Sequence, residues 1–147
     1  MLKISTKRFN ELSNQELYDL LQLRSEVFVV EQDCVYQDLD GKDQMALHIL
    51  GYLDNQLVAY TRIFKANDYF NEASIGRVLV KETQRHHKYG NRIMKASIDA
   101  IQKIFQTSAI RISAQTYLKE FYNNLGFYEK GEVYLEDGIP HIQMLKS

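Results

Sequence analysis

The sequence predicts a single α/β domain over residues 1–147, with a mixed, mostly antiparallel sheet and helices on both faces. Short segments rich in β-branched residues alternate with stretches of helical periodicity. Two of the expected strands, near residues 75–80 and 109–114, are separated by a helix, and such a crossover makes them parallel neighbours with a right-handed connection. The chain has one proline and no low-complexity stretch, so nothing indicates a linker or a second domain.

The first elements are an edge strand and a helix. Residues 2–9 suit a short strand at the edge of the sheet. Ser13 and Glu16 have the spacing of a capping box, in which each residue satisfies a backbone N–H at the start of a helix. Leucines and Val27 then recur at helical spacing and predict a helix to about residue 30.

The middle of the chain reads as a loop followed by strands. Residues 31–44 are polar and rich in turn formers. Ala46 to Leu53 and Gln56 to Lys65 flank the dipeptide Asp54-Asn55, which predicts a β-hairpin. Ser74 to Val80 is the next expected strand.

The remaining elements continue the alternation of helix and strand. Gly126 follows a short apolar stretch and suits the left-handed position just after a helix. The expected elements are a helix from Gly90 to Phe105, a strand from Ala109 to Ala114, a short helix from Leu118 to Leu125, and strands from Phe127 to Tyr134 and from Pro140 to Leu145 around the turn Glu136-Asp137-Gly138.

A polar turn joins the strand ending at Val80 to the helix starting at Gly90. The first N–H groups of a helix have no partner within it, and with the positive end of the helix dipole they form a site suited to phosphates. Arg85, Lys88 and Arg92 add cationic side chains at the same place. The turn therefore points to a phosphate-bearing ligand; the alternative is an ordinary strand–helix connection with solvated basic residues.

Composition excludes several other classes of protein. The net charge of −1 gives no case for a nucleic-acid partner, and no apolar run is long enough to span a membrane. Cys34, the only cysteine, cannot form an internal disulfide, which suits the cytoplasm, and a four-cysteine zinc site is excluded. The four histidines lack the spacing of metal ligands, so no metal is expected.

Three long segments, in this order and spacing, resemble the GNAT superfamily of N-acetyltransferases and, within it, the ElaA-like subgroup. They are Leu23 to Asp43 with His48 following, Ala114 to Phe127, and Glu132 to His141, and the resemblance extends over nearly the whole chain. It implies a GNAT fold with a splayed pair of parallel strands. The implied function is transfer of an acetyl group from acetyl-CoA to a primary amine of a small molecule, peptide or protein, by direct attack in a ternary complex.

The resemblance also implies where acetyl-CoA binds. The family's pyrophosphate motif reads Gln/Arg-x-x-Gly-x-Gly/Ala, and Arg85 and Gly90 match its ends. Lys88 stands at the middle glycine position, where a side chain limits close backbone approach and makes a positive φ less comfortable. Strand backbone would bind the pantetheine arm, and the turn would bind the pyrophosphate. The residues expected to bind the cofactor are Val78, Leu79, Val80, Arg85, His86, His87, Lys88, Tyr89, Gly90 and Asn91.

Amine acetylation needs a base for the ammonium group and an acid for the departing thiolate. By resemblance Tyr122 is the acid; the alternative is a tyrosine packed under the last helix, with Tyr117 as a weaker rival. Glu31, at the end of the first helix, is a candidate base or else a solvated helix-end carboxylate. His48 is a second candidate base or else a half-buried histidine held by a loop carboxylate.

The acceptor amine is expected to meet Gln115, His141 and Asp40, with acidic residues favouring a cation. We expect one cleft in which Glu31, His48 and His141 approach Tyr122. Arg24 is interpreted as an anchor for the acidic loop that contains Asp38, Asp40 and Asp43.

Two alternatives stay open. Lys88 at a glycine position favours an acyl-CoA-binding module with weak or no catalysis. Arg24, Phe28 and the acidic loop also resemble acyl-homoserine-lactone synthases, but those usually carry a tryptophan after the first helix and this chain has none. The resemblance is compatible with a homodimer, and the expected partners are acetyl-CoA and an amine.

Overall fold

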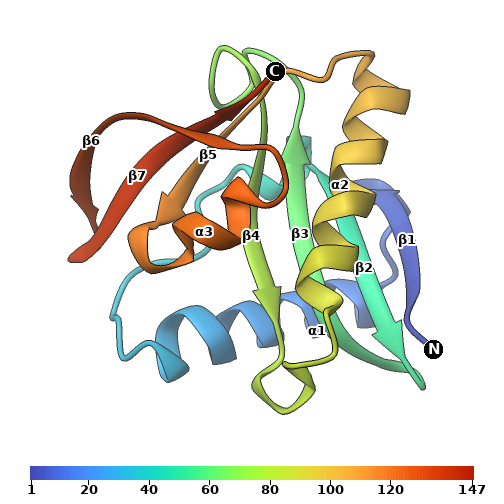
Figure 1. Cartoon of the computed structure of the whole chain (residues 1–147). Coiled ribbons are helices and arrows are strands. Elements are labelled where there is room, and N and C mark those ends of the chain that lie inside the picture. Colours follow the sequence, from blue (N-terminus) through green and yellow to red (C-terminus); the bar gives the residue numbers. More distant parts are fainter.

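A seven-stranded sheet runs through the molecule in the order β1-β2-β3-β4-β5-β7-β6 (Figure 1), and the computed structural model describes all residues, 1–147. Its strands are β1 Lys3–Arg8, β2 Leu47–Leu53, β3 Gln56–Phe64, β4 Ala73–Val80, β5 Ile110–Gln115, β6 Tyr128–Glu136 and β7 Ile139–Lys146. All neighbours are antiparallel except β4 and β5, which are parallel. The mixed, mostly antiparallel sheet expected from the sequence is therefore confirmed.

The first helix, α1, spans Asn14–Arg24 and begins with the predicted capping box. The Glu16 backbone N–H donates to Ser13 Oγ at 3.0 Å, and the Ser13 backbone N–H donates to the Glu16 carboxylate at 2.9 Å. The chain stays helical to the predicted end, but the last part, Ser25–Glu31, is π-helical. The wider turn of a π-helix shifts the faces of the residues that follow α1.

The helices α2, Tyr89–Phe105, and α3, Lys119–Asn123, lie on the opposite face of the sheet from α1 (Figure 1). Successive residues of β3 alternate between the two layers. Ile63 packs in the cluster that contains Ile93 and Ile101 of α2, whereas Tyr60 packs in the cluster that contains Leu20 of α1. Each fully buried aliphatic side chain contributes roughly 1.5–3 kcal/mol, so both layers hold the sheet firmly. No helix is long and apolar enough to cross a membrane.

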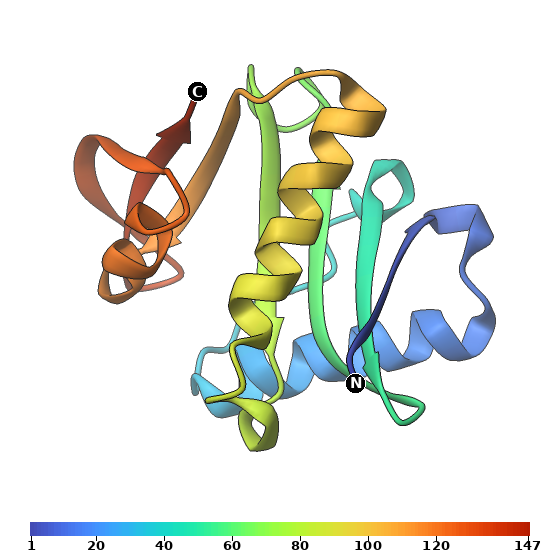
Figure 2. The ribbon, with the colours of Figure 1, turned by 45° about the vertical axis from the view of Figure 1, so that its right-hand side comes forward.

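The parallel strands β4 and β5 pair only at their beginnings and then separate (Figure 2). Their register contains Ala73 with Ile110 and Ser74 with Arg111. Farther along, β4 has a bulge opposite β3, where Arg77 takes a φ of +51°. The predicted splay is therefore present, and it leaves the β5-facing edge of β4 without a strand partner beyond Ser74.

Candidate active site

A cavity of about 770 Å³ lies where β4 and β5 separate. Residues 74–80 of β4 line this cavity. The turn before α2 also lines it, and aromatic and acidic side chains form the rest of its wall. Most of the predicted site residues share this cavity. They are Glu31, Val78, Leu79, Val80, Arg85, His86, Lys88, Tyr89, Gly90, Asn91, Gln115, Tyr122 and His141. His87, His48 and Asp40 do not line it.

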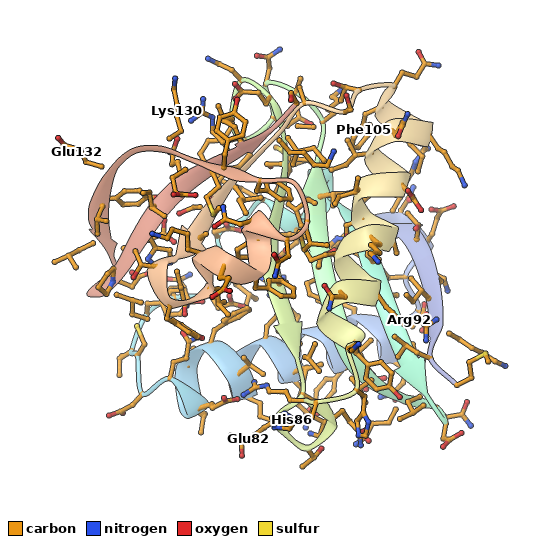
Figure 3. All side chains as sticks on the ribbon, viewed as in Figure 1. Glu82, His86, Arg92, Phe105, Lys130 and Glu132 are labelled. Atoms are coloured by element: carbon orange, nitrogen blue, oxygen red, sulfur yellow. The ribbon has the colours of Figure 1, made fainter.

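The turn before α2 has the free backbone donors that the sequence predicts. None of the backbone N–H groups from His86 to Asn91 donates to a protein acceptor, and the first helical bond is from Arg92 N–H to the Lys88 carbonyl at 3.2 Å. Lys88 adopts the left-handed conformation, with φ +61° and ψ +25°, that a glycine would take at this motif position. The turn therefore combines a left-handed residue with free backbone amides, and this segment can bind an anion. Figure 3 shows His86 in this turn, beyond the end of β4.

We expect Lys88→Gly to raise the free energy of unfolding by about 0.5–1 kcal/mol. Relief of about 1–2 kcal/mol of left-handed strain is partly offset by the extra conformational entropy, roughly 0.5–1 kcal/mol, that a glycine loses on folding. Urea denaturation measures the change. Lys95→Gly is the matched control: Lys95 is exposed within α2, where glycine costs about 1 kcal/mol. Equal destabilisation by both substitutions would contradict the strain at Lys88.

Two of the three cationic side chains expected at the anion site, those of Arg92 and Arg85, bind other groups of the protein. Arg92 donates through Nη2 to the Leu2 carbonyl at 3.2 Å and lies toward the N-terminal strand (Figure 3), so it does not belong to the anion site. Arg85 donates from both terminal nitrogens to the Glu31 carboxylate, at 2.5 and 2.9 Å, and from Nε to the Val80 carbonyl at 3.0 Å. Arg85 therefore fastens the π-helical segment to the end of β4, and the Val80 carbonyl is already occupied.

Tyr122 lies on α3 at the cavity and is 5% exposed. It packs edge-on against Phe121 and Phe127, and its hydroxyl forms no hydrogen bond with the protein. Burial raises the pKa of Tyr122 far above its usual value near 10. The phenol is therefore protonated at neutral pH and free to donate. Tyr117, its rival, also lines the cavity but is 73% exposed.

Glu31 and Gln115 line the cavity without contacting each other. The Glu31 carboxylate is held by Arg85, and Gln115 Nε2 donates to Gln32 Oε1 at 3.4 Å. A carboxylate in a bidentate ion pair is a poor acceptor for a substrate proton. The geometry therefore makes Glu31 a partner of Arg85.

His141 on β7 is buried and has a carboxylate beside it. Its Nδ1–H donates to the Ile139 carbonyl at 2.7 Å, which directs Nε2 toward Glu136 Oε2 at 3.5 Å. Ser113 of β5 also donates to Glu136, at 3.2 Å, and pairs with the Tyr134 hydroxyl. The cavity thus contains a histidine–carboxylate pair that can accept and relay a proton.

A buried ionic network fastens the loop after the first helix to the sheet. Arg24, with 0% exposure, donates to Asp38 at 2.8 Å and to Asp43 at 2.7 Å. The other two arginines come from β3 and β4: Arg62 donates to Asp40 and Asp43, and Arg77 donates to Asp38. The interpretation of Arg24 as the loop anchor is confirmed.

The same network removes two predicted residues from the site. The Asp40 carboxylate accepts from Arg62 at 2.6 and 2.9 Å, so it is not available to a cationic amine. His48 is fully buried, with Nδ1 2.6 Å from the Tyr60 hydroxyl and Nε2 2.9 Å from the Asp43 carbonyl. The expected approach of His48 to Tyr122 is not found, because β2 carries its ring into the network.

His48 makes stability depend on pH. Burial lowers the pKa of His48 below its usual value of about 6.5. The unfolded chain therefore binds a proton first, so stability is complete above about pH 6.5 and falls as the pH drops toward the folded pKa. We expect His48→Gln to flatten the loss of stability between pH 7.5 and 5.5 in urea titrations. The exposed His87→Gln serves as control, and an unchanged slope in His48→Gln would contradict the assignment.

Sequence reasoning missed Arg62 and Ser74, which both line the cavity. The sequence does contain a signal for Arg62, because this residue places a charge within the apolar strand LVAYTRIF. A charged residue in a buried strand needs partners, and these came from a distant loop.

The splayed sheet, the unpaired amides before α2 and Tyr122 meet at one cavity, and this combination suits an acyltransferase. The chain belongs to the GNAT acetyltransferase family: residues 9–147 match the family model described as "Acetyltransferase (GNAT) domain". It is 43% identical to protein ElaA of Escherichia coli, over 100% of this chain and 97% of that protein.

Solved structures of similar proteins have the same fold. An acyl-CoA N-acyltransferase from Pseudomonas aeruginosa superposes with a TM-score of 0.95 at 38% identity, and E. coli ElaA with 0.93 at 42%; both alignments cover 100% of each chain. The AHL synthase LasI reaches a TM-score of 0.81 at 13% identity, over 99% of this chain and 89% of that one. That last likeness shows a shared fold alone.

Proposed function

We propose that the protein transfers an acetyl group from acetyl-CoA to a primary amine by direct attack in a ternary complex. One observation supports this above the others: a single cavity joins the free amides from His86 to Asn91, the unbonded hydroxyl of Tyr122 and the histidine–carboxylate pair of His141 and Glu136. A thioester ligand can reach the acid and the acceptor side at once.

The donor half is assigned to acetyl-CoA. The amides before α2 would hold the pyrophosphate, helped by Lys88 and by the positive end of the helix dipole. The unpaired edge of β4 at Val78 would extend the sheet with the amide groups of pantetheine. Arg85 keeps the end of β4 in place by its ion pair with Glu31, which we assign as a positioning residue.

The acceptor half supplies the proton chemistry. In our proposal His141 Nε2 takes a proton from the ammonium group, and Glu136 stabilises the resulting charge. The amine nitrogen then bonds to the thioester carbon, the carbon–sulfur bond breaks, and Tyr122 protonates the thiolate. The nitrogen, which is positively charged after it attacks, releases its second proton, and that proton restores the Tyr122 phenol. No cysteine is needed, since the attack is direct and no acyl-enzyme forms.

The direct test is thiol release from acetyl-CoA with a panel of primary amines, alongside melting curves with acetyl-CoA and longer acyl-CoAs. We expect amine-dependent thiol release and a rise in Tm, because a ligand that binds only the folded state stabilises it. A rise in Tm with no release for any amine would replace the enzyme by a CoA-binding module. Faster release with longer acyl-CoAs than with acetyl-CoA would overturn the acetyl assignment.

We expect His141→Gln to lower kcat/KM about 100-fold at neutral pH, in the range attributed to a general base, and to remove the acidic limb of the pH–rate profile. Glu31→Gln is the comparison, because its carboxylate faces Arg85 and should affect the KM for acetyl-CoA rather than the acidic limb. Loss of that limb in Glu31→Gln, with His141→Gln unchanged, would exchange the two roles.

A further inference from the structure

Two buried polar atoms in the wall of the cavity have no hydrogen-bond partner: Arg62 Nε and Ser74 Oγ. Their residues are 1% and 2% exposed. Nearly all buried polar groups in proteins are paired, so two unpaired atoms in residues that line one cavity need an explanation. An oxygen atom of a bound ligand would satisfy both.

The β3–β4 register brings the two atoms to one face of the sheet. Arg62 is opposite Gly76, and Phe64 is opposite Ser74, which makes Arg62 and Ser74 diagonal neighbours. Gly76 lies beside Ser74 on the same face, and a Cβ built on it would meet no atom within 4 Å. The space above Gly76 is therefore open, and Gly76, Arg62 and Ser74 all line the cavity.

The charges around the two unpaired atoms limit the kind of ligand oxygen that can bind there. The terminal nitrogens of Arg62 already bind Asp40 and Asp43, so Nε is the one guanidinium nitrogen with no partner, and the guanidinium charge is offset. Glu136 and Asp137 line the same cavity and disfavour a ligand carboxylate. A neutral carbonyl oxygen can accept from Arg62 Nε–H and from the Ser74 hydroxyl without adding charge.

We propose that Arg62 and Ser74 bind a neutral carbonyl oxygen of the acceptor, so that the acceptor is an amine that also carries an amide-type carbonyl. The inference rests on the proposed function and deepens it. Ser74 precedes Val78, where the pantetheine arm is proposed to pair, by four residues, roughly 13 Å along the strand. The amine and the carbonyl are accordingly several bonds apart in the substrate.

The test compares ω-amino amides with three to five methylene groups against n-alkylamines and ω-amino carboxylates of equal length. We expect kcat/KM to favour the amides at least tenfold over both, as loss of one or two hydrogen bonds predicts. Ser74→Ala should reduce the preference for amide over alkylamine about tenfold. Glu72→Gln, on the surface away from this cavity, is the control and should keep it.

Gly76→Ala provides a second variant that should fold normally, because its Cβ meets no protein atom. We expect an unchanged Tm and a KM for the amides raised tenfold or more, since the methyl group occupies ligand space. Equal rates for amides and alkylamines, or an amide preference that survives Ser74→Ala, would overturn the inference while leaving acetyl transfer intact.

A binding measurement keeps the two proposals separable. NMR titration of the protein, with and without CoA, measures amide binding even where no turnover occurs. Amides that bind through Ser74, together with no thiol release for any amine, would support the carbonyl site and refute the transferase. Amides that fail to bind, or that bind no better than alkylamines, would refute the carbonyl site.

Discussion

Replacing Tyr122 by phenylalanine is expected to lower kcat about 100-fold while the affinity for acetyl-CoA stays nearly unchanged. The ring remains packed against Phe121 and Phe127, so only the hydroxyl is lost. That hydroxyl has no protein partner to be left unpaired, and burial keeps it protonated by raising the pKa of Tyr122. Steady-state kinetics with a good acceptor and calorimetric titration with acetyl-CoA give the two quantities.

Tyr117→Phe is the matched control, because Tyr117 lines the same cavity but is 73% exposed. It should change kcat less than threefold. If Tyr122→Phe keeps full turnover and Tyr117→Phe loses it, the acid is Tyr117. The raised pKa of Tyr122 adds a second expectation: activity should show no alkaline decline near pH 10, where an exposed tyrosine would ionise.

Of all the substitutions proposed, removal of the Asp43 carboxylate from the buried network is expected to lower the free energy of unfolding the most. Asp43 accepts from Arg24 at 2.7 Å and from Arg62 at 3.0 Å. Burial alone would raise the pKa of Asp43, but Arg24 and Arg62 hold it below its ordinary value. Asp43→Ala leaves two buried guanidinium groups short of a partner, which costs about 3–5 kcal/mol. The urea midpoint should fall strongly with little change in m-value.

Glu26→Ala is the control for an exposed pair. Glu26 binds Lys81 at 3.0 Å with 45% of its side chain exposed, so its removal should cost about 1 kcal/mol or less. If Asp43→Ala does not fold, Asp43→Asn, which keeps an oxygen acceptor but no charge, should lose stability to a smaller extent. Equal losses in Glu26→Ala and Asp43→Asn would show that the network contributes little.

The network also explains why three arginines converge on one loop. The loop of residues 32–42 has little regular structure, so its backbone cannot be held by sheet or helix hydrogen bonds. Arg24 Nη2 and Arg77 Nη2 both donate to the Asp38 carbonyl, at 3.2 and 2.9 Å. Side chains from α1 and β4 thus replace the missing backbone partners, and they keep the loop beside the acceptor half of the cavity.

Local patterns were enough to predict most elements and the donor half of the site. The capping box at Ser13, the hairpin around Asp54-Asn55, and the turn before Gly90 depend on residues within a few positions of one another. Their physical causes are short-range hydrogen bonds and backbone preferences, which the order of residues alone determines. The parallel pairing of β4 and β5 followed from the helix between them.

The acceptor half of the site depends on contacts between segments that are far apart in the sequence. Strand β7 inserts between β5 and β6, and this brings His141 beside Gln115 and toward Glu136. The same packing pairs the Glu31 carboxylate with Arg85 and buries His48 against Tyr60. It also leaves Arg62 Nε and Ser74 Oγ, in two residues that line the cavity, without a hydrogen-bond partner. Each of these contacts joins polar groups that are tens of residues apart in the sequence. Their pairing depends on burial, because an unpaired charge is costly only once water is excluded.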